Sequence, residues 1–169
     1  DNPYTVTATA AGDALTANTA YEFYVQADCG GDGMSTWSGP FAFSTVCEAI
    51  YSFPWTEDFE AVTTPALPDC WNEINNNADV DSFKTYTAFG IDGSKAAGLN
   101  TDYNSGDNDD YLILPPFVLT GNERLRFSVR ARSELDPNDY RVVLSATGMD
   151  PEDFDTELMP LTEVASTTH

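Results

Sequence analysis

The chain has 169 residues, of which 41% are apolar, enough for one ordinary domain or two small ones around a packed core. Seven basic residues stand against 28 acidic ones, giving a formal net charge of −21. This balance argues against nucleic acid and anionic membranes as partners, because phosphate binding needs a basic footprint. No run of 18 apolar residues is present, so no membrane insertion is predicted. The acidity suits a secreted, cation-binding protein.

Short strands are predicted along the whole chain. Apolar residues recur with a period of two, and no period of 3.6 residues lasts beyond two turns. Strands are predicted at residues 21–27, 111–114, 124–132 and 140–145. Pro115 and Pro116 end the second of these, and clusters of Gly, Pro, Asn and Asp separate the others. The sequence therefore predicts an all-β sandwich or jelly roll.

The first 47 residues contain a recognisable corner. Leu15 stands six residues before Tyr21 at a strand start, which is the spacing of a tyrosine corner, where the phenol bonds the backbone upstream. A strand ending at Cys29, a Gly-rich loop and a closing strand at residues 37–45 follow. The pattern resembles the last three strands of a fibronectin type III domain, in the cysteine-containing version common in Bacteroidota surface proteins. A complete domain is about twice as long, so we expect half a sandwich with an exposed core face.

The second part carries four motifs in a fixed order. They are Asp58-Phe59-Glu60, Pro68-Asp69-Cys70-Trp71, Asp109-Asp110-Tyr111-Leu112-Ile113-Leu114-Pro115 and, at the end of a strand, Ser145-Ala146-Thr147-Gly148. Together they resemble the cleaved adhesin family, the MAM-like jelly rolls of gingipain haemagglutinin regions and of many secreted Bacteroidota proteins. The resemblance implies a non-catalytic adhesion or substrate-binding domain, and several jelly rolls of this family hold structural calcium.

These patterns define the predicted domains. We expect residues 1–47 to be the C-terminal part of a fibronectin type III domain, residues 48–53 a linker, and residues 54–169 a jelly roll. The adhesin family usually continues with further strands, and the chain starts at Asp1 without a Met. We therefore expect both domains to be truncated.

A calcium site is predicted in the second part. The candidate ligands are the carboxylates Glu60, Asp79, Asp81, Asp109 and Asp110. Asp102 and Asp107 are weaker candidates, because they lie farther from the strand that fixes Asp109 and Asp110. An EF-hand beginning at Asn77 is excluded, since Ser82 and Ala88 stand where that loop needs Gly and Glu. The alternative is a set of solvated acidic loops.

Enzymatic chemistry is not indicated. The one histidine is His169, the last residue, which argues against Ser-His-Asp, Cys-His and zinc sites. With 28 carboxylates, no acid–base pair is singled out. We therefore predict that the chain is not an enzyme.

Two sets of side chains are candidates for ligand binding. Five of the seven basic residues fall within 18 positions, and Arg126, Arg130 and Arg132 lie on one face of the predicted strand. They could bind an anionic glycan or a partner's carboxylates, or simply pair with local acids such as Glu123 and Glu134. The aromatic residues of the loops, Tyr86, Phe89 and Tyr103, could form a sugar platform or pack within their loops.

Three cysteines allow one disulfide. Cys29 and Cys47 end successive strands of a hairpin, which would place them a strand length apart, so a bond between them is doubtful. A Cys47–Cys70 bond could staple the linker onto the jelly roll. Cys29 would then lack its partner.

The functional prediction is a non-catalytic adhesion or binding module of a large secreted or surface-anchored bacterial protein, stabilised by calcium. Its expected location is extracellular, and its expected partners are a host or matrix protein, a glycan, or neighbouring domains of the same polyprotein. Two alternatives remain open. The chain could be a carbohydrate-binding accessory module of a secreted hydrolase, or a structural spacer between domains.

Overall fold

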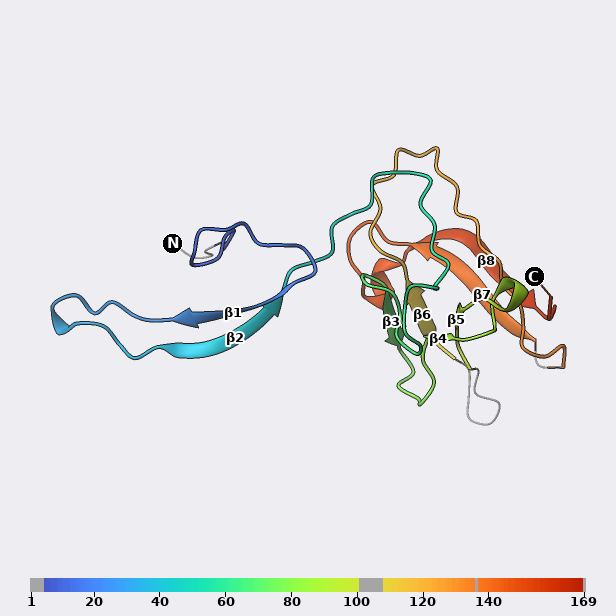
Figure 1. Cartoon of the computed structure of the whole chain (residues 1–169), viewed down its shortest axis with the longest axis horizontal. Helices are drawn as coiled ribbons and strands as arrows, with labels where there is room; N and C mark the ends of the chain where they lie inside the picture. The colour runs from blue at the N-terminus through green and yellow to red at the C-terminus, as the bar shows by residue number, and fades with distance from the viewer. Residues whose placement is uncertain (1–4, 101–107, 136, 169) are drawn as a thin grey trace. The chain divides into compact units, whose positions relative to one another are not determined.

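The computed structural model describes residues 5–100, 108–135 and 137–168, so Asp102, Tyr103 and Asp107 lie outside the described residues. The chain divides into two compact units, Asp1–Ile50 and Tyr51–His169. The described residues contain β-strands and short 3-10 turns, which confirms the predicted all-β class (Figure 1). Within them, no helix has the length and apolarity needed to cross a membrane.

The first unit is built on one antiparallel hairpin. Strand β1 (Ala20–Val25) pairs with β2 (Ser38–Ser44), and the 3-10 turn η1 (Gly30–Asp32) lies in the connection (Figure 1). The register of this pairing shifts between Phe23 and Val25. At that point Gly39 of β2, which has a φ of 135°, lies close against β1. A Cβ at Gly39 would lie 2.9 Å from the carbonyl oxygen of Phe23, so this close crossing requires glycine.

An aromatic face covers one side of this hairpin. The rings of Tyr21 and Phe43 stack with centroids 5.7 Å apart, and those of Phe23 and Phe41 lie 5.2 Å apart. Cross-strand aromatic pairs of this kind stabilise a hairpin and fix its register. Phe23 and Phe41 nevertheless remain exposed.

Among the described residues of the second unit, the strands form three antiparallel ribbons. Strand β3 (Asn72–Asn75) pairs with β6 (Asp110–Ile113), β4 (Lys84–Tyr86) with β5 (Ala96–Gly98), and β7 (Asn138–Leu144) with β8 (Thr156–Val164). The β7–β8 ribbon is drawn in orange to red in Figure 1. The 3-10 turns η2 (Ile91–Gly93) and η3 (Pro151–Asp153) precede β5 and β8.

A small core holds the second unit together. Ile113 and Ala131 are its buried hydrophobic residues among those described, and Thr85 is fully buried. The hydroxyl of Thr85 donates to the carbonyl of Ala66 at 2.8 Å, so burial leaves no unpaired polar atom there. Trp71 packs against Phe59 at 5.3 Å and against Trp55 at 6.3 Å.

The strand predicted at residues 124–132 is not formed, and that prediction was wrong. Figure 1 draws this segment as a coil. Within the described part of the chain, its backbone makes one backbone–backbone hydrogen bond, from Ala131 N–H to Ser166 O at 2.7 Å. A strand exists only when a neighbour completes its ladder. The alternation of apolar and charged residues predicted two faces for this segment, but it could not show that a neighbouring strand would be absent.

Candidate functional site

The β3–β6 ribbon carries an acidic cluster, defined here as Asp79, Asp81, Asp109 and Asp110. The ribbon register places Asn75 opposite Asp110. The Asn75 amide donates to the carbonyl oxygens of Asp79 at 2.9 Å and Asp81 at 2.8 Å. These bonds fold the loop after β3 back on itself. They explain why an Asn stands at the end of a strand, where its side chain replaces backbone partners.

A neighbouring amide fixes the other half of the cluster. The Asn76 backbone N–H donates to the Asp109 carbonyl at 2.9 Å, and its side chain donates to Asp109 Oδ2 at 2.6 Å. Asp109 is therefore held at the entrance of β6, as its place beside the predicted strand suggested. From sequence, the Asn75-Asn76-Asn77 run was interpreted as one of the turn signals, and Asn77 also as the start of an EF-hand loop that was then excluded. Its position directly before two acids spaced two apart could have indicated that its amides organise them.

Asp110 has an unusual environment. Its Oδ2 accepts a hydrogen bond from Asn108 at 3.1 Å, whereas its Oδ1 is buried and has no hydrogen-bond partner among the described residues. Burial raises the pKa of Asp110, and the negative charges of the other three cluster members raise it further, against a lowering by Asn108. An unpaired carboxylate oxygen surrounded by like charges is the environment that a cation relieves.

The structure does not bring all predicted metal ligands together. Glu60 is engaged elsewhere, since its carboxylate accepts the backbone N–H of Lys95 at 2.7 Å. The Lys95 ammonium donates to the carbonyls of Glu60 and Val62 at 3.0 and 2.7 Å. Across the described residues, no group of three Asp, Glu, His or Cys side chains is arranged to hold a metal ion. A cation at Asp110 therefore requires carbonyl or amide oxygens as well, which calcium accepts.

A second site combines members of the two predicted ligand-binding sets, and we call Lys84, Tyr86, Phe89 and Arg130 the Phe89–Arg130 cluster. The rings of Tyr86 and Phe89 lie 5.7 Å apart. The Arg130 guanidinium carbon lies 5.7 Å from the Phe89 ring centroid, and its Nε donates to the Phe89 carbonyl at 3.2 Å. The Lys84 ammonium lies 5.9 Å from the Tyr86 ring. Two cations are thus held beside two aromatic rings.

The polar groups of the Phe89–Arg130 cluster are only partly satisfied. Arg130 makes a second hydrogen bond, from Nη1 to the carbonyl of Thr167 at 3.5 Å, so both of its acceptors among the described residues are neutral. The Tyr86 hydroxyl is buried without a hydrogen-bond partner among the described residues, and Phe89 is 40% exposed. The cluster therefore presents positive charge and an aromatic surface together.

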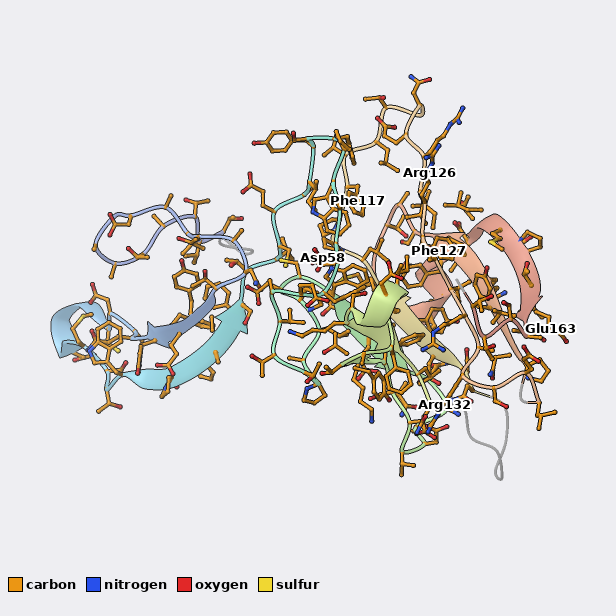
Figure 2. The ribbon with its side chains drawn as sticks, turned by 45° about the vertical axis from the view of Figure 1, so that its right-hand side comes forward. Asp58, Phe117, Arg126, Phe127, Arg132 and Glu163 are labelled. Carbon is orange, nitrogen blue, oxygen red and sulfur yellow. The ribbon has the colours of Figure 1, made fainter. Side chains whose placement is uncertain are left out.

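Among the described residues, the arginines form no ion pair with Glu123 or Glu134. Hydrogen bonds, first from the Thr120 hydroxyl at 2.7 Å and then from backbone N–H groups of its own loop, lower the pKa of Glu123 to about 2. Glu134 instead accepts a 3.4 Å hydrogen bond from Thr167. In the described segments, Arg124, Arg126 and Arg132 have no hydrogen bond or ion pair. Figure 2 shows Arg126 and Arg132 on either side of Phe127 along the chain.

The cysteines form one disulfide. Cys47 and Cys70 are disulfide-bonded, and Cys29 is free and exposed. This is the staple expected from the sequence, and it leaves Cys29 as the odd thiol.

Comparisons with known proteins agree with the motif order. The family model described as Cleaved Adhesin Domain matches residues 55–168. A search of curated proteins and a search of solved structures returned no match.

Proposed function

We propose that this chain, which belongs to the cleaved adhesin domain family, is a non-catalytic binding module. It forms part of a secreted or surface-anchored bacterial protein and binds its ligand outside the cell. Family membership supports adhesion as the general role. The observation that carries the proposal for this chain is the positive charge of the Phe89–Arg130 cluster, which no carboxylate neutralises among the described residues, on a protein of net charge −21. A cation without an acidic neighbour on such a protein is a site for an external anion.

The ligand that fits this cluster carries a carboxylate beside an apolar or sugar-ring surface. Two carbonyls hold the Arg130 guanidinium beside the Phe89 ring, so its planar fork is pre-organised. A carboxylate can pair with that fork while a ring lies against Phe89 and Tyr86. An acidic glycan or an acidic side chain of a matrix protein meets both conditions. Arg132 lies two residues from Arg130 and adds to the local positive charge.

The experiment compares binding of acidic glycans and matrix proteins to the protein and its variants. We expect Arg130→Gln and Phe89→Ala each to weaken binding about tenfold, the order of one charged hydrogen bond or one aromatic contact. Arg141→Gln, a charge change on β7, is the matched control and should leave binding unchanged. Equal binding by all variants would exclude the cluster. Absence of any ligand would favour the spacer role, and preference for neutral glycans would favour the carbohydrate-binding accessory module.

The same proposal includes a structural calcium ion at the acidic cluster. The unpaired Oδ1 of Asp110 and the like charges around it support this placement. Because no three carboxylates are arranged to hold a metal among the described residues, Asp110 would bind the ion with at most one of Asp79, Asp81 and Asp109, and carbonyl or amide oxygens would complete its shell. Bound calcium would supply the positive charge that the cluster lacks. Glu60 is left out of this set because Lys95 engages it.

The module is proposed to lack catalytic activity. The cleaved adhesin family is non-catalytic in general. Turnover of a peptide or glycoside substrate by the purified chain, lost on substitution of a named carboxylate, would overturn this part of the proposal.

A further inference from the structure

One segment of the second unit has the chemistry of a strand without a neighbour. We call residues 123–130 the open segment. Among the described residues, its backbone N–H and C=O groups make no backbone–backbone hydrogen bond. It contains no proline, so nothing in its covalent structure prevents a ladder. Unpaired backbone groups along a proline-free, alternating segment are a template for strand pairing.

The open segment is fixed at both ends. At its start, the Glu123 carboxylate accepts the N–H groups of Thr120, Gly121 and Asn122 at 2.9, 2.9 and 3.1 Å. Directly after its end, Ala131 is buried and donates to Ser166 O at 2.7 Å. The intervening backbone is therefore held between two anchored points. A partner strand would lose less entropy on pairing with it than with a free tail.

One side of the open segment is apolar and incompletely covered. Exposure falls along this side from 53% at Leu125 through 50% at Phe127 and 38% at Val129 to 3% at Ala131. Phe127 meets the Tyr140 ring of β7 edge-on at 6.0 Å. The row thus packs at its Ala131 end and remains open at its Leu125 end, where another apolar surface can be buried.

The opposite side is cationic and uncompensated. Within the described residues, Arg124 and Arg126 have no hydrogen bond or ion pair, and the nearest acid in sequence, Glu123, is committed to its own loop. Their spacing of two residues equals the side-chain period of a strand. A partner with carboxylates on alternate residues would meet both guanidiniums in one register.

We infer that the open segment accepts an extended strand from a protein partner, with carboxylates on alternate residues facing Arg124 and Arg126 and apolar residues covering Leu125 and Phe127. Strand addition satisfies the backbone groups, and the two side-chain rows select the partner's sequence. The inference rests on the proposed binding function and specifies a protein ligand. It assigns recognition of that ligand to Arg124, Leu125, Arg126 and Phe127, whereas the side chain of Arg130, at the end of the segment, belongs to the Phe89–Arg130 cluster.

The test uses the full chain and a nonapeptide of alternating Glu and Val. We expect the alternating Glu-Val peptide to bind the protein in isothermal titration calorimetry. Three control peptides should bind at least tenfold more weakly: a block-sequence peptide of the same composition, an alternating Lys-Val peptide, and a Glu-Val peptide N-methylated at alternate residues. Binding should weaken as salt rises, and amides of residues 124–130 should exchange more slowly when the peptide is bound. If the block-sequence peptide or the N-methylated peptide bound as tightly as the alternating Glu-Val peptide, the inference would be overturned.

Protein variants separate this inference from the proposed function. The double variant Arg124→Gln/Arg126→Gln should lose about tenfold in peptide affinity and keep its binding of acidic glycan, whereas Phe89→Ala should do the reverse. If the unmodified protein binds acidic glycan but not the peptide, only the strand-addition site is refuted. If it binds the peptide but not acidic glycan, only the Phe89–Arg130 cluster is refuted. Self-association of the chain without peptide, abolished by the double variant, would assign the segment to a second copy and overturn the partner named here.

Discussion

The backbone N–H of Thr16 donates a 2.8 Å hydrogen bond to the phenol oxygen of Tyr21 at the start of β1. The same bond, before any other contact, lowers the pKa of the Tyr21 phenol. The Tyr21 ring stacks on Phe43 of β2 at 5.7 Å. One side chain therefore joins the chain before the hairpin to both of its strands.

Removing this hydroxyl should loosen the first unit. We expect Tyr21→Phe to keep the ring stack, to lower the thermal midpoint and to speed exchange of the Thr16 amide, because that N–H loses its acceptor. Tyr24→Phe is the matched control, since the Tyr24 hydroxyl makes a 3.4 Å contact with Glu22 on its own strand. Native-state hydrogen exchange checks the prediction. Unchanged exchange at Thr16 in Tyr21→Phe would show that the phenol does not hold this corner.

Calcium should stabilise the protein through Asp110. At free calcium 100 times the dissociation constant, mass action gives about 2.7 kcal/mol of stabilisation. Asp110→Asn should abolish this response. It should also raise the stability of the calcium-free protein, because it removes a buried charge and its repulsion with Asp79 and Asp109.

Thermal unfolding with calcium and with chelator measures both effects. Asp139→Asn, an exposed position on β7, is the control and should keep the calcium response. If chelator leaves the unmodified protein's midpoint unchanged, the calcium site does not exist. If Asp110→Asn responds like the unmodified protein, calcium binds elsewhere.

Elements with a strong local signal were predictable from sequence. The spacing of Leu15 and Tyr21 anticipated the Thr16–Tyr21 bond, and Pro115 marked the end of β6. Strands β3, β4, β5 and β8 were missed, and the assignment of Tyr86 to a loop was wrong, because Tyr86 is the last residue of β4. Strands β4 and β5 have three residues each, too few to show a period. Strand β3 has one apolar residue, Ile74, so no period can appear. In β8, Pro160 interrupts the pattern where the register shifts against β7.

The candidate sites required the fold. Phe89 and Arg130 lie 41 residues apart in sequence, and each was assigned to a separate pattern until the structure placed them in contact. The arginine face could equally have been neutralised by Glu123, and sequence could not show that this carboxylate bonds its own loop. Which groups a carboxylate such as Glu123 bonds depends on the backbone geometry of its loop. The alternation of apolar and charged residues along the sequence does not determine that geometry.

The Glu123 loop should give a specific pH dependence. The folded pKa of about 2 lies below the ordinary value of about 4.3. A depressed carboxyl pKa stabilises the folded state above the unfolded value, and this contribution is lost as pH falls from about 4.3 through about 2. Carbon-13 NMR titration of the carboxyl group should show the low pKa directly. Glu123→Gln should remove this part of the acid sensitivity, whereas Glu134→Gln should not. Titration of Glu123 near its ordinary value would contradict the loop geometry.

The disulfide should make a large contribution to stability. Closing the loop between Cys47 and Cys70 restricts the unfolded chain, and the chain-entropy model gives about 3 kcal/mol for a loop of this size. Cys47→Ser/Cys70→Ser should lower the unfolding free energy by that order, as should reduction of the unmodified protein. Cys29→Ser is the control and should have little effect, because Cys29 is exposed and free. Iodoacetamide should label one thiol per native chain by mass spectrometry, at Cys29. Labelling of Cys47 or Cys70 without reductant would rule out the bond.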